Sequence, residues 1–438
     1  MRRWTWLSLS LLLTFWTIPV QAAGRFIVRV NGGFAAVQAV CSLTGCSVVE
    51  GIDRSLGQVF LVTTPDFVDP NTALHTLINT AGVVSVEPDL LAHTAEASNQ
   101  VPPALQDNTP TPYYGSTVPH GYISQPATQK IRLADLRAAY PNATGAGVVA
   151  VIDTGVDPKH PALQGVLLPG YDFTRNQSGA DETLDVNLSS APVVDGVGPQ
   201  WVKGTGSGLL DQSTAAVVDQ STAAVVDGNP QYSDFGHGTM VAGIIHLVAP
   251  TARILPLKVF RSDGTGYTSD ILRGIYWAMD LHANVLNMSF HLASYSQELA
   301  NALNLANLGG AISVAAAGND GQKTSVYPAA LDVVMGIAST TNDDQLSSFS
   351  NYGPQLVWVA APGEGIVTTY PFSTYAASWG TSFSTPFVSG AAAVMLSVNP
   401  ICNQRGSAQS TAHAQAIGPN AGYGRLDIYQ ALQAAGAQ

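Results

Sequence analysis

Three short, glycine-flanked segments of this 438-residue chain each carry one side chain that can take part in nucleophilic catalysis. Asp153 ends the apolar run GVVAVID, His237 stands in DFGHGTMVAG, and Ser382 stands in GTSFSTPFVSG. A serine attacks a carbonyl carbon when a base removes its proton, and that base needs a carboxylate to hold its tautomer. These residue types therefore indicate an acid, a base and a nucleophile for acyl transfer.

A fourth segment, AAAGND, supplies an amide that acyl transfer can use. Asn319 follows an apolar run and a glycine, a pattern typical of a tight turn at the end of a buried strand. We expect an amide N–H at this turn, together with the backbone N–H of Ser382, to donate to the oxyanion that forms on the substrate carbonyl. The four residues together predict the full set of groups for hydrolysis of an acyl compound.

The elements expected around these segments are those of an open α/β sheet. From about residue 126, apolar runs typical of buried parallel strands alternate with helical patterns, the clearest being a helix over 268–280 with Ser269 as its cap. A parallel sheet covered by helices on both faces gathers its ligands at the carboxyl ends of its strands. The runs expected as strands are 147–153, 254–260, 285–290, 311–317, 333–339 and 356–361.

The four segments resemble, in sequence and in order, the signature blocks of the subtilase family of serine endopeptidases. The blocks are DTGVD, HGTMVAG, AAAGN and GTSFSTP, and the similarity covers residues 126–434. The resemblance implies a subtilisin-like parallel sheet with helices on both faces. It also implies that Asp153 orients the histidine, that His237 is the general base and acid, and that Ser382 is the nucleophile. Asn319 would then stabilise the oxyanion.

The resemblance also implies where a substrate binds. The strand that pairs with substrate usually reads Ser-Leu-Gly-Gly in the family, and here it reads SFHL over 289–292. Val326 stands where relatives often carry a glycine at the floor of the primary specificity pocket. We therefore expect a small or shallow pocket that favours alanine and other small residues at P1. The expected substrate-binding residues are Ser289, Phe290, His291, Ala316, Ala317, Gly318 and Val326.

Residues 1–22 are typical of a signal peptide. Two arginines precede an apolar stretch over 4–20, and Val20 and Ala22 are small residues at the positions that cleavage requires. We expect cleavage after Ala22 or Ala23, and a secreted protein, extracellular or periplasmic, with no membrane span once the signal is removed. A signal anchor that stays in the membrane is the alternative.

The remaining chain divides into three parts. Residues 24–95 alternate strand and helix patterns, as in a small ferredoxin-like α+β domain. Prolines and polar residues with little periodicity predict a linker over 96–125. Residues 126–438 form the peptidase domain, which contains a low-complexity insertion at 175–230 with two copies of DQSTAAVV. We assign no function to that insertion.

The 24–95 module resembles the inhibitor-like propeptide of the family, most clearly at VEPDLLAH. A short helix is predicted over 71–81, with Asn71 as its cap. The resemblance implies an intramolecular inhibitor whose C-terminal tail enters the active site like a product. Self-cleavage is then expected between Ala95 and Glu96. Trimming of the exposed linker by other proteases is the alternative.

Composition and charge exclude several other classes of protein. The net charge is −12 and no run of lysine or arginine is present, so no nucleic-acid partner is expected. Three cysteines form neither a disulfide framework nor a zinc pattern, although Cys41 and Cys46 are close enough in sequence to join. The expected partners are protein or peptide substrates and the chain's own propeptide, and a monomer is expected.

No cofactor or metal is expected to be required. Calcium-binding relatives often carry an aspartate where Ala162 stands, so the usual strong calcium site is expected to be absent, while calcium binding elsewhere stays open. Two functions compete: a self-processing endopeptidase, and a catalytically silent secreted protein that keeps the fold for binding or as a scaffold. The presence of Asp153, His237, Ser382 and Asn319 favours the enzyme.

Overall fold

The chain forms two compact units in the computed structural model. The smaller comprises residues 24–50 and 60–88, and the larger comprises residues 51–59 and the described residues from 89 onward. The N-terminal domain was expected to end at residue 95. In the structure the smaller unit ends at residue 88, because residues 51–59 and 89–93 belong to the larger unit. The signal peptide lies outside the described residues, which are 24–93, 102–186, 216–217, 230–400, 418 and 420–436.

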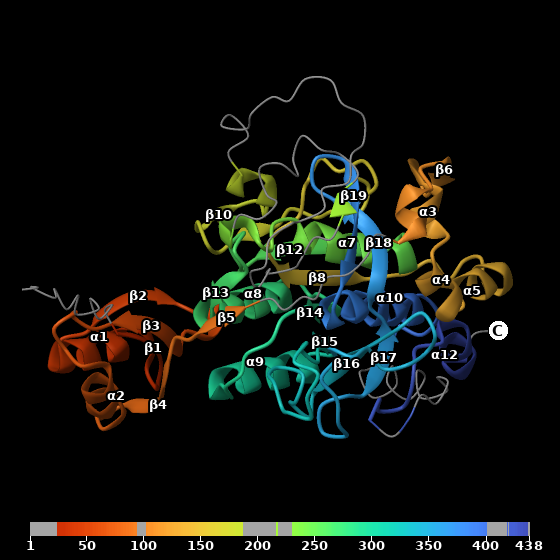
Figure 1. Ribbon diagram of the computed structural model, residues 1–438. Coiled ribbons are helices and arrows are strands. Elements are labelled where there is room, and N and C mark those ends of the chain that lie inside the picture. The colour runs from red at the N-terminus through yellow and green to blue at the C-terminus, as the bar shows by residue number, and fades with distance from the viewer. Residues whose placement is uncertain are drawn as a thin grey trace, which may run out of the picture. The chain divides into compact units, whose positions relative to one another are not determined.

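The smaller unit is a four-stranded sheet with two helices that lie side by side (Figure 1). Its strand order is β2-β3-β1-β4, and β1 runs antiparallel to β4. Alternate residues of β1 face the helices, so that Phe26, Val28 and Val30 form one core with Val37 of α1 and Leu77 of α2. The elements are β1 Arg25–Val30, α1 Gly33–Thr44, β2 Ser47–Gly51, β3 Val59–Thr63, α2 Pro70–Ile78 and β4 Val83–Pro88.

The structure revises local details of this unit. The cap of α2 is Asp69 and not Asn71, because the Asp69 carboxylate accepts a backbone N–H in the first turn. Pro70 follows at the first helical position, where the missing N–H of proline costs the helix nothing. Cys41 and Cys46 are joined in a disulfide that closes the turn between the end of α1 and β2.

The larger unit is built on an eight-stranded sheet with helices on both faces, which confirms the predicted fold class. The order is β10-β9-β12-β8-β14-β15-β16-β17, in which β10 pairs antiparallel with β9 and the other neighbours are parallel. The strands are β8 Val148–Asp153, β9 Tyr171–Asp172, β10 Gln177–Ser178, β12 Arg253–Lys258, β14 Val285–Met288, β15 Ile312–Ala316, β16 Val334–Thr340 and β17 Val359–Pro362.

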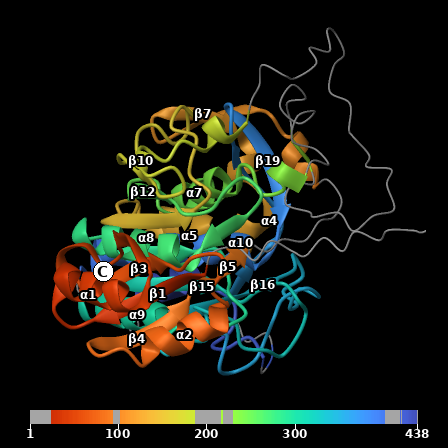
Figure 2. The same ribbon diagram turned by 90° about the vertical axis from the view of Figure 1, so that its left-hand side faces the viewer.

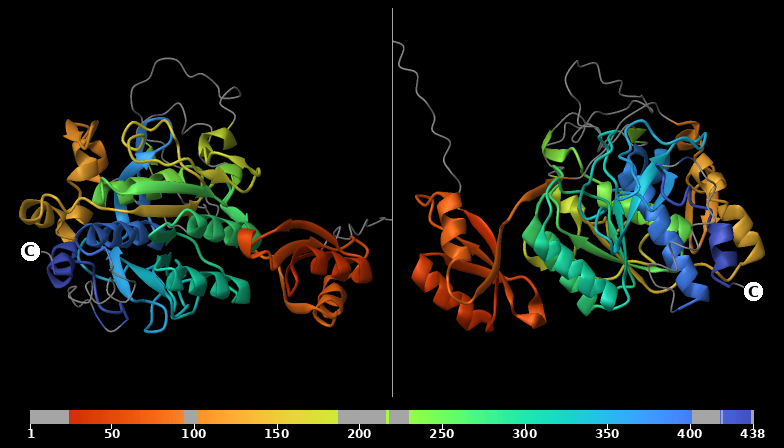
Figure 3. Two further views of the ribbon diagram at one scale, coloured as in Figure 1. Left: turned by 180° about the vertical axis from the view of Figure 1, so that it is seen from behind. Right: turned by 90° about the horizontal axis from the view of Figure 1, so that it is seen from below.

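Four long helices cover this sheet in two pairs. Helices α7 and α10 pack together on one face, and α8 and α9 pack together on the other (Figure 3). A hairpin of β18 and β19 lies against α7 (Figures 1 and 2). The elements are α7 His237–Val248, α8 Thr268–Asp280, α9 Gln297–Leu308, β18 Glu364–Tyr370, β19 Thr374–Trp379, α10 Thr381–Val398 and, near the C-terminus, α12 Ile428–Ala434.

Helix α10 is, in the described part of the chain, the one helix long and apolar enough to cross a membrane, with a mean hydropathy of 1.3. Of the 18 residues of this helix, 83% are buried inside the protein. It contacts α7 and strands β14 to β17, so it is the central core helix of the larger unit.

Residues 102–125, expected as part of a linker, are packed onto the larger unit. They form η2 Pro103–Gln106, a hairpin of β6 Pro110–Tyr113 and β7 Ser116–Pro119, and α3 His120–Ile123. The buried Tyr113 and Tyr122 hydroxyls donate to α7 carbonyls, with the bond from Tyr122 to Gly243 at 2.7 Å. Two buried tyrosines thus tie a segment without visible periodicity to the core.

The predicted insertion at 175–230 is described only in part. Its described residues are 175–186, 216–217 and 230, so most of both DQSTAAVV copies lies outside them. Two residues of the first copy form β11 Ala216–Val217, which pairs antiparallel with β19.

Candidate active site

Asp153 and His237 meet side chain to side chain. Asp153 is the last residue of β8 and His237 the first of α7, and Asp153 Oδ1 lies 2.6 Å from His237 Nδ1. Both side chains are buried, at 1% and 0% exposure. Because a carboxylate only accepts, Nδ1 must carry the proton, which leaves Nε2 as the ring nitrogen able to take a proton from a nucleophile.

Glycines allow the two segments to approach. Gly236, at the cap of α7, has a φ of 92°, which favours glycine. A Cβ at Gly238 would lie 1.9 Å from the carbonyl oxygen of Gly155, so the chain after Asp153 and the chain after His237 touch backbone to backbone. The glycines that flank the expected acid and base are therefore a steric requirement of their contact.

Ser382 lies at the second position of α10 and is fully buried. Its Oγ donates to the Ser289 carbonyl at 3.0 Å, and the Ser289 Oγ donates to the Ser382 carbonyl at 2.8 Å. The neighbouring Phe383 ring lies 5.3 Å from the His237 ring between centroids. The start of α10 is thus held between the end of β14 and the start of α7.

Asn319 is fixed against the residue that precedes the expected nucleophile. Its Oδ1 accepts from the backbone N–H of Thr381 at 2.9 Å and from the Thr381 hydroxyl at 2.8 Å. Gly318, with a φ of 89°, turns the chain out of β15, and its N–H donates to the same hydroxyl at 3.1 Å. Both contacts hold the orientation of the Asn319 amide relative to the start of α10.

Most of the expected substrate-binding residues come together. Leu292 and Tyr327 exchange backbone hydrogen bonds of 2.6 and 2.9 Å, which brings the 289–292 strand next to the buried Val326. On the other side, a Cβ at Gly318 would be 3.6 Å from His291 Nδ1. Ala316 and Ala317, also buried, lead from β15 into the same place.

The side chain of Phe290 does not point toward the other expected substrate-binding residues. Its side chain is fully buried and its ring packs on Phe260, with centroids 5.0 Å apart. The Phe290 side chain belongs to the core, so the expectation that Phe290 binds substrate can concern only its backbone and stays a prediction. The alternation of side chains along an extended segment explains the difference, because His291 then points the opposite way.

Residues 89–93 occupy the larger unit next to α8. Strand β5, Leu91–His93, pairs antiparallel with β13, Thr265–Tyr267, in a two-stranded sheet. Asp89 accepts the N–H and the hydroxyl of Ser269, both at 2.9 Å. Ser269 therefore lies inside the first turn of α8 and is not its cap. The Asp89 carboxylate accepts a backbone N–H of that turn instead. The Ala95–Glu96 bond lies outside the described residues.

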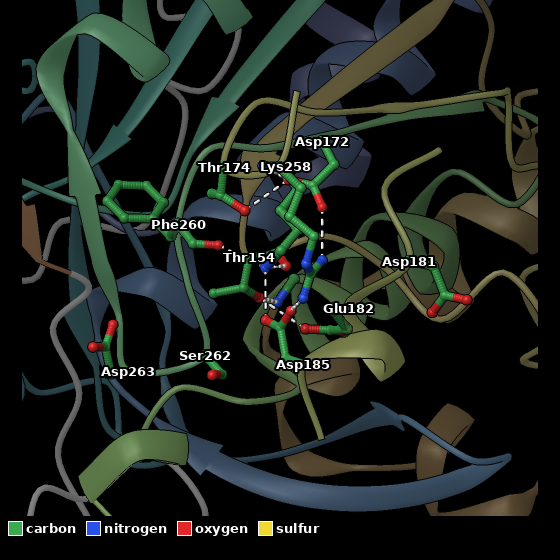
Figure 4. A network of polar contacts seen from close by, with 12 residues as sticks. Thr154, Asp172, Thr174, Asp181, Glu182, Asp185, Lys258, Phe260, Ser262 and Asp263 are labelled. Carbon is green, nitrogen blue, oxygen red and sulfur yellow. Dashed lines mark hydrogen bonds and ion pairs between the residues drawn. The ribbon is translucent and has the colours of Figure 1, made fainter. Parts of the chain in front are cut away.

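A buried polar network that the sequence patterns did not indicate surrounds Glu182 and Lys258 (Figure 4). Glu182 is fully buried and bonded to Thr154 and Thr239. Burial raises the pKa of Glu182 to about 7, and the hydrogen bonds from Thr239 and Thr154 act in the opposite direction. Lys258 within the apolar run ILPLKVF was the one available signal, because a buried lysine requires partners.

No group of three or more His, Cys, Asp or Glu side chains able to hold a metal occurs among the residues that the structure describes. Ala162 is buried and offers no side-chain oxygen, and only residues 249–252 connect α7 to β12.

Comparison with known proteins gives consistent similarities. The peptidase S8 profile of the subtilase family matches residues 145–425, more than half of the chain. Thermitase of Thermoactinomyces vulgaris is 34% identical over 333 residues, which cover 73% of this chain and all of thermitase. A thermophilic serine proteinase of Bacillus sp. strain AK1 is 33% identical over 286 residues, which cover 65% of this chain and 61% of that relative.

The fold is similar to that of a solved structure. The crystal structure of fervidolysin from Fervidobacterium pennivorans, a keratinolytic enzyme related to subtilisin, superposes with a TM-score of 0.70. The match covers 94% of this chain and 61% of that chain at 21% identity. This likeness concerns the fold alone.

Proposed function

Because this chain belongs to the subtilase family of serine peptidases, we propose that it hydrolyses peptide bonds with Asp153, His237 and Ser382 as its triad and Asn319 as an oxyanion donor. The observation that carries the proposal is the 2.6 Å contact between His237 Nδ1 and Asp153 Oδ1, both buried. That contact fixes the tautomer that a general base needs, at the start of a helix that packs on the helix of Ser382.

The proposed reaction follows from these atoms. The Ser382 hydroxyl turns from the Ser289 carbonyl toward His237 Nε2, gives up its proton there and bonds to the substrate carbonyl carbon. The carbonyl oxygen becomes an oxyanion that accepts from Asn319 Nδ2 and from the Ser382 N–H. His237 then donates its proton to the leaving amine, and water releases the acyl group in a second round.

We also propose that the chain is made as a secreted, self-processed precursor. The pairing of Leu91–His93 with Thr265–Tyr267 supports this, because it seats the tail of the N-terminal module as an added strand close to the cut expected between Ala95 and Glu96. Asp89 on the first turn of α8 supports the same seating. The N-terminal signal sequence supports export to an extracellular or periplasmic site.

The remaining proposals concern partners. Proteins or peptides are the substrates, the N-terminal module is an intramolecular inhibitor, and the enzyme works as a monomer without a required cofactor. The buried Ala162 supports the loss of the strong calcium site that relatives carry.

One experiment tests both activity and self-processing. Purified precursor is incubated without added protease, and the N-termini of its products are sequenced beside those of Ser382→Ala precursor. We expect a new N-terminus at or near Glu96 in the first sample and an intact chain in the second. Processing of Ser382→Ala at the same bond would show that another protease cuts there.

A serine-directed fluorophosphonate separates the enzyme from a silent scaffold. Processed protein should be labelled at Ser382, and heat-unfolded protein should not. An unlabelled, folded and processed sample would refute the proposed activity.

A further inference from the structure

Four hydrogen-bond donors converge on the carboxylate of Glu182. Its side chain is fully buried at the start of η3, Glu182–Asp185. Oε2 accepts from the Thr154 hydroxyl at 2.8 Å and from the Gly236 N–H at 3.1 Å. Oε1 accepts from the Thr239 N–H at 3.0 Å and from the Thr239 hydroxyl. Each oxygen therefore has two donors.

The direction of these bonds is fixed by their neighbours. The Thr154 hydroxyl accepts the N–H of Gly238 at 2.9 Å, and the Thr239 hydroxyl accepts the N–H of Asp157 at 2.8 Å. In this arrangement each of the two hydroxyls directs its single proton at Glu182. Four incoming donors favour the ionised carboxylate and oppose the burial that raises the pKa of Glu182.

The four donors belong to the two segments that carry the proposed acid and base. Thr154 follows Asp153 directly, whereas Gly236 and Thr239 flank His237 on either side. Glu182 comes from neither segment, and its hydrogen bonds join the two. One side chain thus ties the end of β8 to the start of α7.

A buried carboxylate needs a counter-charge, and Lys258 supplies one nearby (Figure 4). Its fully buried ammonium donates to the carbonyl oxygens of Thr154 and Phe260, both at 2.7 Å, and to Asp185 at 2.8 Å. In the sheet, Lys258 of β12 lies in register with Asp153 of the neighbouring strand β8. The negative charge of Glu182 is therefore held in a network that reaches Asp153 through Thr154.

We propose that Glu182 is a positioning residue for the peptidase reaction, which sets the distance and orientation between Asp153 and His237 by binding the backbone and hydroxyls beside them. The proposal rests on the function proposed above. Its physical basis is the steep dependence of catalysis on the placement of reacting groups, where a shift of about 1 Å costs on the order of a hundredfold in rate.

The test compares Glu182→Gln with a matched control, Asp172→Asn. Both changes replace a buried carboxylate by its amide, but Asp172 accepts from Thr174 and Arg175 and not from the segments beside Asp153 and His237. We expect Glu182→Gln to lower kcat by about tenfold or more with KM within about twofold, since its NH2 group would face two donors. Asp172→Asn should lower Tm and leave kcat within about twofold.

Two further measurements distinguish an effect of Glu182 on the placement of His237 from an effect on the stability of the fold. The proton NMR resonance of His237 Nδ1–H reports directly on the bond to Asp153, and it should move or broaden in Glu182→Gln and stay in Asp172→Asn. Glu182→Asp keeps the charge and should restore part of kcat. If Glu182→Gln lowers Tm as the control does but leaves kcat and the His237 Nδ1–H resonance unchanged, Glu182 is merely structural and the proposal is wrong.

A second pair of variants covers the case in which Glu182→Gln does not fold. Thr154→Val removes one donor at nearly constant volume, and Thr154→Ser retains it. The valine variant should lose kcat relative to the serine variant, and equal kcat values would overturn the proposal. Failure of the underlying function is distinguishable, because the unaltered protein would then neither cleave peptides nor react with a fluorophosphonate.

Discussion

Asn319 Oδ1 accepts two hydrogen bonds from Thr381, the residue directly before Ser382. The amide is thereby held with its oxygen turned toward the start of α10. An oxyanion donor is effective when its orientation is set before the reaction begins, since no reorganisation is then needed as charge develops.

Removing this donor should affect the rate and not substrate binding. Asn319→Ala is expected to lower kcat by roughly 10²–10³-fold with little change in KM, because the bond to the oxyanion forms in the transition state. Thr381→Val, which leaves the amide but removes one of its two anchors, should cost roughly two- to tenfold. Steady-state kinetics on a peptide substrate measure both. An Asn319→Ala enzyme with unchanged kcat would contradict the assignment.

The primary pocket should be widened by a single substitution. Val326 is buried beside the bridge between Leu292 and Tyr327, at the position expected to form the pocket floor. Val326→Gly should raise kcat/KM for phenylalanine at P1 relative to alanine, and Val326→Ala should lie between. Peptide libraries read the preference. If the unaltered enzyme already prefers phenylalanine or lysine, the pocket is not small.

Activity should survive peroxide. Phe383, next to the proposed nucleophile, is fully buried and has no sulfur to oxidise. Phe383→Met should convert a resistant enzyme into a sensitive one, with mass spectrometry placing the sulfoxide at position 383. Equal rates of inactivation in the two proteins would show that oxidation elsewhere limits activity.

Stability should fall in acid because of His246. Its ring is buried against Tyr113, and neither ring nitrogen has a hydrogen-bond partner among the residues that the structure describes. Burial, helped by the positive charge of Arg137, lowers the pKa of His246 to about 4. Below the ordinary value of 6.5 the unfolded chain binds a proton that the folded chain refuses until about pH 4.

The contribution of His246 to stability is thus intact above pH 6.5 and lost as the pH falls toward 4, at no more than about 1.4 kcal/mol per pH unit. His246→Leu should therefore stabilise the protein more at pH 5 than at pH 8. Urea unfolding of the Ser382→Ala protein measures this without self-digestion, and exposed His75→Gln is the control. An equal effect of His246→Leu at both pH values would contradict the expectation.

The fold class could be predicted because its signals are local. Apolar runs bounded by glycines indicate the strands. Residue 238 must be a glycine, because a Cβ there would lie 1.9 Å from the carbonyl oxygen of Gly155. Glu182 could not be found in this way, because its partners lie 28 to 57 residues away and a lone glutamate in a polar stretch has no periodicity. The same holds for Tyr113, whose contacts with α7 span more than 130 residues.

The three-residue ladder between β5 and β13 has a consequence for the timing of activity. While the chain is continuous, the tail pairs with β13 at the high effective concentration that a covalent tether imposes. Once the bond proposed to be cut is broken, the same strand is a separate molecule, and its occupancy depends on the concentration of the pair. Release of the enzyme into a larger volume would then act as the trigger, so that dilution sets when proteolysis begins.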